Sequence, residues 1–324
     1  MTAQNLTLPD RLSSRLARRR AAVENERPVW EEPPSIPGRI SKGVVLGLVV
    51  LAVTFPLYVV VVTSLSSTEA VTRAGGLVVV PRELTLAAYV QLLSGGVVTK
   101  ALVVSMGVTA IGTLFSLAIT VLAAYGLSRP GSLLHRPLLF VVLLTFLFGP
   151  GIIPSYLLVS SLGLIDSYAS LILPTAISAF NLIVMRSFFM GIPGELIDSA
   201  RVDGAGEFGI LTRIVMPLSK AVVAVVGLFY AVSYWNAFFN ALLYLNDNNK
   251  WPLQLVLRTY IVQAQQLPSG AGGIAASPGM NLAPAPTLAI KMAIVVIAVL
   301  PVLLAYPFIQ KHFTKGVIIG AVKG

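Results

Sequence analysis

The sequence predicts an all-α membrane protein that crosses the bilayer six times. Of its 324 residues, 56% are hydrophobic and only 11% are charged, which leaves too few polar side chains to cover a soluble globule. The chain also contains six apolar runs of the roughly 20 residues that a helix needs to cross a hydrocarbon core of about 30 Å. None of these runs shows the two-residue alternation of a barrel strand, so we expect helices.

The predicted spans follow one another along the chain, with short connections at 128–136 and 162–166 and longer ones at 66–100, 191–220 and 246–286. They are expected at residues 43–65, 101–127, 137–161, 167–190, 221–245 and 287–310. This divides the chain into a polar, disordered tail (1–42), a first helix with its extracytoplasmic loop (43–100), a five-helix core (101–310) and a C-terminal tail (311–324). The core contains the long loop, residues 191–220. Prolines such as Pro150 and Pro174 fall inside the spans, where each removes a backbone donor and loosens a turn.

The distribution of basic residues predicts the orientation. With the N-terminus inside, 17 of the 23 Lys and Arg residues lie in cytoplasmic segments, as the positive-inside rule requires. We therefore expect both termini in the cytoplasm of a bacterial cell, with the spans in its plasma (inner) membrane. The Arg-rich stretch from Arg11 to Arg20 is either a membrane-surface anchor or a binding arm.

Composition argues against enzymatic and cofactor chemistry. The chain has no cysteine, and its two histidines, His135 and His312, are too few and too far apart to form a metal site. No Gly-x-x-x-x-Gly-Lys-Ser/Thr phosphate loop is present, so we do not expect this chain to hydrolyse ATP. No catalytic residue, metal site or bound cofactor is predicted.

The loop between the fourth and fifth predicted spans carries the most specific pattern. At helical spacing, its apolar residues form two small faces, while its charged residues project elsewhere. The apolar residues are Ile197, Ala200, Ala205, Phe208, Leu211 and Ile214. The pattern predicts two short amphipathic helices that are broken at Gly204.

This loop resembles the EAA loop of binding-protein-dependent ABC importer permeases. Asp198-Ser199-Ala200 stands at the Glu-Ala-Ala positions, Gly204 follows after three residues, and Ile214-Val215-Met216-Pro217 follows after nine more. The substitutions relative to the family pattern preserve charge, small size or apolar character. The resemblance implies the type-I permease fold of ABC importers.

In that family the loop docks on a separate ATPase, so the resemblance also implies a set of coupling residues. Small residues permit close approach, Asp198 pairs with a basic group of the ATPase, and Gly204 permits the turn. The implied coupling residues are Glu195, Asp198, Ser199, Ala200, Asp203, Gly204, Ala205, Phe208, Ile214 and Pro217, together with Lys323 and Gly324 at the C-terminus.

Three further segments are similar to carbohydrate-importer permeases of the MalG type, in particular those assigned to uptake of oligosaccharides and polysaccharide fragments. They are Ser233–Tyr244, Asn246–Arg258 and the ending Tyr306–Gly324. The resemblance implies import of a carbohydrate, expected to be an oligosaccharide, and three protein partners. These are a homologous second permease, an ATPase dimer that binds ATP and Mg²⁺, and an extracytoplasmic sugar-binding protein. Membrane lipid is expected around the spans, and no nucleic acid.

Polar and aromatic residues inside the spans are candidates for the substrate path, because amides bind sugar hydroxyls and aromatic rings stack on sugars. They are Asn181, Tyr234, Trp235, Asn236 and Asn240. Packing between helices is the alternative role of each.

An ion-coupled secondary transporter is the alternative function. Such a protein needs coupling residues near the membrane midplane. All 13 acidic residues fall in the tail or in predicted loops, so no proton relay is evident, although backbone carbonyls can hold sodium.

Overall fold

The computed structural model describes residues 35–94, 96–129, 131, 134–262 and 287–321, and its secondary structure there is helical apart from an isolated bridge between Ser66 and Leu84. The chain separates into two units, residues 1–57 and 58–324. The described part of the first unit is the beginning of helix α2 (Ile36–Ser64), which contains Pro56. The second unit holds all the other elements.

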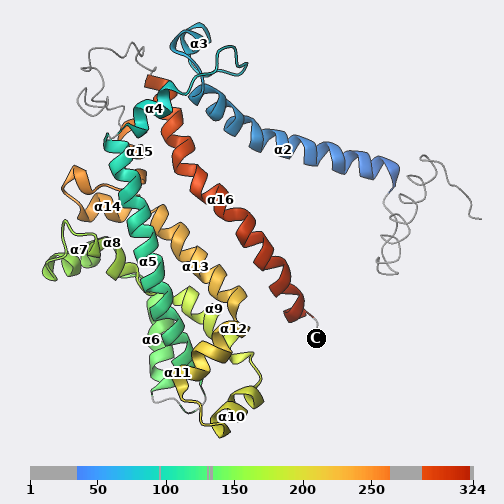
Figure 1. Ribbon diagram of the computed structural model, residues 1–324, viewed down its shortest axis with the longest axis vertical. Helices are drawn as coiled ribbons and strands as arrows, with labels where there is room; N and C mark the ends of the chain where they lie inside the picture. Colours follow the sequence, from blue (N-terminus) through green and yellow to red (C-terminus); the bar gives the residue numbers. More distant parts are fainter. Residues whose placement is uncertain (1–34, 95, 130, 132–133, 263–286, 322–324) are drawn as a thin grey trace, which may run out of the picture. The chain divides into compact units, whose positions relative to one another are not determined.

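Helix α5 (Val97–Ser128) is the axis of the second unit. It packs along α13 (Lys220–Trp235) and α9 (Ala179–Met190), as Figure 1 shows. Helix α16 (Thr287–Ala321) packs on α13 and on α15 (Leu253–Val262). A second hydrophobic cluster joins α16 and α15 to α4 (Ala87–Leu93), next to the short α3 (Thr68–Arg73).

Small residues let α5 and α13 approach closely. A Cβ added at Gly112 would lie 2.9 Å from the Tyr234 ring, and one at Gly227 would lie 3.3 Å from Leu117. Two buried hydrogen bonds of 2.7 Å, Ser116–Tyr234 and Thr120–Tyr230, join the same pair of helices. Small residues at the contact and polar side chains across it are the usual means of association between helices in a bilayer.

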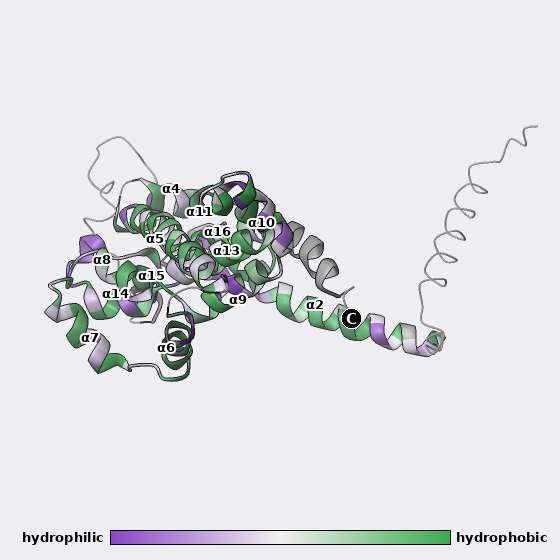
Figure 2. Ribbon diagram, turned by 90° about the horizontal axis from the view of Figure 1, so that it is seen from below, coloured by the Kyte–Doolittle hydropathy of each residue, from purple (hydrophilic) through white to green (hydrophobic). Residues whose placement is uncertain are grey.

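Three helices are long and apolar enough to cross a membrane without interruption: α2, α5 and the part of α16 from Leu288 to Pro307. Three bent helix pairs also pass this test when each pair is counted as one span, which allows up to six spans; the third pair joins residues 207–218 to α13, whereas the predicted fifth span was 221–245. Figure 2 shows that hydrophobic residues dominate these helices.

The predicted third span, 137–161, is interrupted. The segment forms α6 (His135–Leu147) and α7 (Ile152–Ser161), which meet at an angle of 120°. Pro150 disfavours helical backbone at the preceding Gly149, and Gly151 has a φ of +82°. The helix therefore ends before this pair and restarts in a new direction.

The fourth and fifth predicted spans are also interrupted. Residues 167–190 form α8 (Ala169–Ile172), the 3-10 turn η1 (Leu173–Thr175) and α9, with a bend of 52° after Pro174. The Ser178 side chain caps the restarted α9 by accepting a hydrogen bond from the Asn181 N–H. Residues 221–245 divide into α13 and α14 (Phe238–Tyr244), separated by Asn236 and Ala237.

The helix boundaries differ at both ends of the chain. Helix α2 begins at Ile36 rather than near residue 43, and α16 continues to Ala321 where a tail from residue 311 was expected. The remainder of the predicted N-terminal tail, residues 1–34, lies outside the described residues.

One ion pair fixes the loop after α7 to the connection after α14. The Lys250 ammonium donates to the Asp166 carboxylate at 2.7 Å, and this carboxylate also accepts from the backbone N–H groups of Asn246 and Asp247. These hydrogen bonds lower the pKa of Asp166, with the Lys250 bond as the largest cause. The 3-10 turn η3 (Asn248–Lys250) positions the lysine.

Candidate functional site

The long loop between α9 and α13 folds as two helical pieces. Helix α10 (Gly194–Val202) is followed by a turn, and a second piece runs through α11 (Glu207–Ile210), the π-helical η2 (Leu211–Val215) and α12 (Met216–Leu218). Gly204 lies in the turn with a φ of +81°, in agreement with the predicted break. The turn is closed by hydrogen bonds from the Gly204 N–H to Arg201 O and from the Ala205 N–H to Ala200 O.

One face of this segment belongs to the main hydrophobic core. Ile197 of α10 is buried, as are Ile210, Leu211 and Val215 of the second piece. They join a cluster that includes Met185 and Phe189 of α9 and the end of α5, and Ala200 and Ala205 pack against it. The segment is therefore seated on the helix bundle through these residues.

Polar contacts fix the segment to the end of α5. The Arg201 guanidinium pairs with Glu207 at 2.9 Å, and the Tyr125 hydroxyl donates to the other oxygen of Glu207 at 2.5 Å. Arg129 donates to the Tyr125 oxygen at 2.7 Å and lies 4.3 Å from the centre of its ring. We call Arg201, Glu207, Tyr125 and Arg129 the α5 clamp.

The clamp keeps Glu207 ionised. Hydrogen bonds from Tyr125 and then Arg201 stabilise the carboxylate and lower the pKa of Glu207 below its ordinary value, against the opposing effect of partial burial. Glu207 is therefore negatively charged at neutral pH, and the ion pair between the two helical pieces is present.

The outward side of the segment presents acidic, small and apolar groups. Glu195, Asp198, Ser199 and Asp203 are exposed, with 74% of the Asp198 side chain accessible. Phe208, which the sequence pattern placed on an apolar face, is 73% exposed, and Val202 is 88% exposed. Ile214 is half-buried and Pro217 is exposed. Exposed large apolar side chains beside acidic ones are typical of a surface that another protein covers.

Val202 was not among the predicted site residues. A sequence signal for it exists, since a large β-branched residue follows Arg201 at the polar end of an amphipathic helix. The predicted coupling residues Lys323 and Gly324 lie outside the described residues.

Three of the predicted substrate-path residues form side-chain hydrogen bonds within this chain, and that of Asn236 is donated to Val232 O at 2.9 Å. The buried Tyr234 hydroxyl bonds to Ser116 and donates to Ile172 O, and the Trp235 indole donates to Ala298 O at 2.9 Å. Asn181 is buried near the start of α9. Asn236 is exposed and Asn240 is half-buried.

The structure brings two unpredicted residues of α15 to this region. The Gln254 amide lies 3.4 Å from the Asn236 side-chain oxygen, and the Arg258 guanidinium lies 5.3 Å from the Phe238 ring centre. The signal that sequence reasoning missed is the four-residue spacing of Gln254 and Arg258, which places both on one face of a helix. We call Asn236, Gln254 and Arg258 the polar cluster.

The bent apolar spans define a multi-span membrane protein. The helical segment between two of them is seated on the bundle and exposes acidic and apolar groups. Residues 116–319 match the family of binding-protein-dependent transport system inner membrane components, and the chain belongs to this family.

Curated relatives match along nearly the whole chain. The polygalacturonan/rhamnogalacturonan transport system permease protein YtcP of Bacillus subtilis (strain 168) is 46% identical over 274 residues, which are 85% of this chain and 94% of that protein. The arabinooligosaccharides transport system permease protein AraQ of the same organism is 31% identical over 279 residues, 83% of this chain and 90% of the relative.

A solved structure has the same fold. It is the crystal structure of a bacterial ABC transporter involved in the import of the acidic polysaccharide alginate, and one of its chains matches with a TM-score of 0.79 and 31% identity. The match covers 89% of this chain and all of that chain.

These findings establish the class of the protein. It is a multi-pass permease component of an ABC importer, not an enzyme, and a separate ATPase subunit hydrolyses the ATP. Membership of the family implies an ATPase, a substrate-binding protein and a second permease as partners. An ion-coupled secondary transporter is not favoured.

Proposed function

We propose that this permease imports an oligosaccharide derived from an acidic polysaccharide. The observation that carries the proposal is 46% identity along 94% of a permease named for polygalacturonan and rhamnogalacturonan. Polygalacturonan, like alginate, is a polymer of uronic acids, so its fragments carry a carboxylate on successive sugar rings. An extracytoplasmic binding protein would deliver the fragment, and the second permease would form the other wall of the path.

The segment from Glu195 to Pro217 couples the permease to the ATPase in this proposal. Its buried face and the α5 clamp fix it to the bundle, so a movement imposed on it is transmitted to α5, α9 and α13. Its exposed side supplies Asp198 for a basic partner group and Val202 and Phe208 for an apolar recess. The positive-inside distribution supports a cytoplasmic location for this segment and for both termini.

The polar cluster supports the choice of substrate. Amides of Asn236 and Gln254 suit sugar hydroxyls, and the half-buried Arg258 supplies a cation for a carboxylate. The half-buried Asn240 is a further amide of the predicted path. Tyr234 and Trp235 directly precede Asn236 in the chain and are buried packing groups. Asn181 is a buried amide near the start of α9.

The test of coupling is purification of the whole importer with Asp198→Lys. We expect this variant to insert in the membrane normally, to lose the co-purifying ATPase and to lose ATP-driven uptake, because a lysine reverses the charge of a 74% exposed group. Glu69→Lys is the matched control, since Glu69 is 72% exposed and is also paired with an arginine. The control should retain both properties.

Two outcomes would contradict the proposal. Unchanged ATPase association and uptake in Asp198→Lys would remove the coupling role of the segment. Solute movement through the isolated wild-type chain in liposomes without ATP would favour a secondary transporter instead. The substrate class is tested separately, by comparing uptake of oligogalacturonides with uptake of neutral oligosaccharides of equal length.

A further inference from the structure

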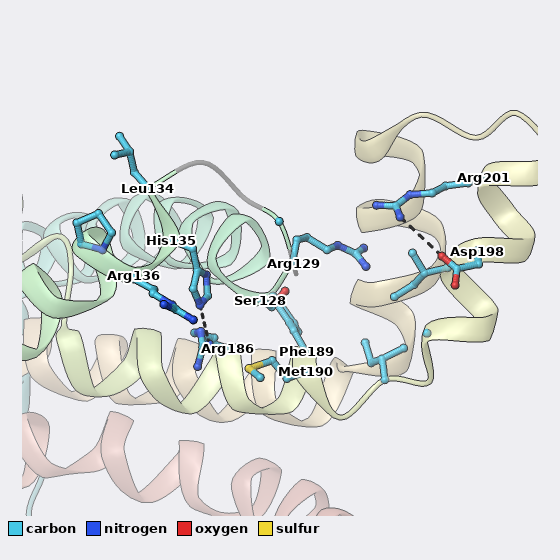
Figure 3. A pocket seen from close by; sticks show the side chains of 15 residues that line it. Ser128, Arg129, Leu134, His135, Arg136, Arg186, Phe189, Met190, Asp198 and Arg201 are labelled. Atoms are coloured by element: carbon cyan, nitrogen blue, oxygen red, sulfur yellow. Dashed lines mark hydrogen bonds and ion pairs between the residues drawn. The ribbon is translucent and has the colours of Figure 1, made fainter.

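A cavity of about 920 Å³ lies where the end of α5, the start of α6, the end of α9 and helix α10 meet. Figure 3 shows His135, Arg136 and Arg186 on one side of it, Asp198 and Arg201 on the other, and Arg129 extending between them. The proposed function assigns Asp198 to the ATPase contact and Arg129 and Arg201 to the α5 clamp, and it gives no role to Arg136, Arg186 or His135. Four arginines line this open cavity, Arg129, Arg136, Arg186 and Arg201, together with a single carboxylate, that of Asp198.

Three of these arginines lack a carboxylate partner. Arg201 pairs with Glu207 and approaches Asp198 at 3.7 Å, whereas Arg129, Arg136 and Arg186 form no ion pair in the described part of the chain. Arg129 is held by the Tyr125 hydroxyl, and Arg186 donates to the carbonyl of Leu127 at 2.9 Å. The cavity is therefore strongly cationic.

Two buried nitrogen atoms in the lining residues also lack hydrogen-bond partners among the described residues. They are Nε of Arg129 and Nδ1 of His135. The Arg186 guanidinium lies 3.3 Å from Nε2 of His135 and is a donor only, so Nε2 accepts and the histidine proton resides on Nδ1. Both unpaired atoms are thus hydrogen-bond donors, and an acceptor-rich anion is the group that matches this site.

The surroundings of the cavity are apolar on the side of α6. Leu134 and Pro137 line the cavity, and α6 continues from there with exposed Leu138 and Phe140, the latter 65% accessible. A cationic recess at the ends of spanning helices, next to an apolar helix surface, matches a molecule with an anionic head and hydrocarbon chains. Basic pockets between helices at the cytoplasmic face bind phospholipid headgroups in this way.

We propose that this cavity binds the phosphate headgroup of an anionic phospholipid from the cytoplasmic leaflet. Arg129, Arg136 and Arg186 hold the phosphate, and the acyl chains follow the apolar surface of α6. The opposite wall is α10, which belongs to the segment from Glu195 to Pro217, here called the docking segment. The bound headgroup therefore stabilises the position of the docking segment. The inference rests on the proposed function in one respect, the cytoplasmic location of α10.

The test measures lipid retention by the whole purified importer in native mass spectrometry, with phosphatidylglycerol as the probe. The variant is Arg136→Gln, since Arg136 is exposed and forms no ion pair in the described structure. Lys220→Gln is the matched control, because Lys220 is an exposed cation at the start of α13 that neither lines the cavity nor lies in the segment from Glu195 to Pro217. Arg129→Gln is the second variant, because it also removes a buried donor.

We expect the wild type and Lys220→Gln to retain phosphatidylglycerol, and each cavity variant to bind it about tenfold more weakly, the effect of losing one charge-assisted hydrogen bond. In nanodiscs, raising the phosphatidylglycerol content should stimulate ATPase activity in the wild type and the control more than in the cavity variants.

Three results would overturn the proposal. Equal lipid retention in all variants would remove the site. Displacement of the lipid by millimolar inorganic phosphate, with equal stimulation by phosphate in neutral nanodiscs, would identify a soluble phosphate as the ligand. Loss of the ATPase from Arg136→Gln with unchanged lipid retention would assign the cavity to the ATPase interface. If the proposed function itself fails, the wild type will show no ATP-driven uptake, whatever lipid it retains. That result differs from a loss of lipid binding in the cavity variants.

Discussion

Gly204 is the residue on which the shape of the docking segment depends most directly. Its φ of +81° lies in the left-handed region, and an added Cβ would meet no atom within 4 Å. Glycine is therefore required for its backbone conformation. Any residue with a side chain destabilises this turn by about 1 to 2 kcal/mol. Proline is fixed near a φ of −65° and cannot adopt this turn at all.

We accordingly expect Gly204→Pro to abolish ATP-driven uptake while membrane insertion is retained, because α10 and α11 can no longer keep their relative position. Gly204→Ala should lower the stability of the docking segment by about 1 kcal/mol and reduce uptake only partly. Uptake assays on vesicles with equal amounts of inserted protein measure both effects. Full uptake in Gly204→Pro would show that the turn does not transmit motion.

Glu207 gives the α5 clamp a pH dependence. Its folded pKa is lowered by Tyr125 and Arg201, so the ion pair contributes its full stabilisation above the ordinary carboxyl pKa of about 4.3 and loses it as pH falls through the folded value. The side chain is 56% exposed, so the contribution is at most about 1 kcal/mol.

Glu207→Gln should therefore unfold at a lower temperature than the wild type near neutral pH, and the two Tm values should converge below about pH 4. Thermal unfolding in detergent across this pH range measures the difference. A constant Tm difference at every pH would mean that the carboxylate charge does not contribute.

At the scale of the elements, the contact between α5 and α13 depends on the absence of a side chain at Gly112. The Tyr234 ring that faces it is held by hydrogen bonds to Ser116 and Ile172, so it cannot move aside freely when a Cβ arrives at 2.9 Å. Overpacking of this kind typically costs about 1 to 3 kcal/mol.

We expect Gly112→Ala to lower the thermal stability of the detergent-solubilised protein. Gly107→Ala on the same helix is the control, because no atom lies within 4 Å of the added Cβ and alanine favours a helix more than glycine does. The control should be neutral or stabilising. Equal effects of the two substitutions would contradict close packing at Gly112.

The elements also show how far the sequence can predict this fold. Hydropathy located the apolar runs, because the length of a run depends on composition alone. It did not predict the 120° turn at Pro150 and Gly151, because an apolar run that reverses direction has the same hydropathy as a straight one. The motif spacing placed the break at Gly204 correctly.

The candidate site was only partly predictable for a similar reason. Periodicity assigns Phe208 to the same face as Leu211, but α11 is a single turn followed by a π-helix, and Phe208 is exposed while Leu211 is buried. Gln254 and Arg258 were missed because their proximity to Asn236 and Phe238 arises from tertiary packing between α15 and α14.

At the scale of the whole molecule, the proposed function assigns two tasks to the two ends of α13. The docking segment leads into α13 at its start, and Asn236 of the polar cluster follows its last residue, Trp235. Helices α5 and α13 pack along their shared length through small residues and buried hydrogen bonds. Because the docking segment and the polar cluster share no residue, we expect a substitution in the cluster to leave ATPase association unchanged.

Arg258 tests that separation. If it binds a substrate carboxylate, Arg258→Gln should raise the KM for oligogalacturonide uptake about tenfold, the effect of losing one charge-assisted hydrogen bond, while uptake of a neutral oligosaccharide and ATPase association stay unchanged. Lys100→Gln, which removes an exposed cation near the start of α5, is the control for a general charge effect. An equal loss for charged and neutral sugars would assign Arg258 to packing on Phe238 instead, since loss of that contact affects the path regardless of substrate charge.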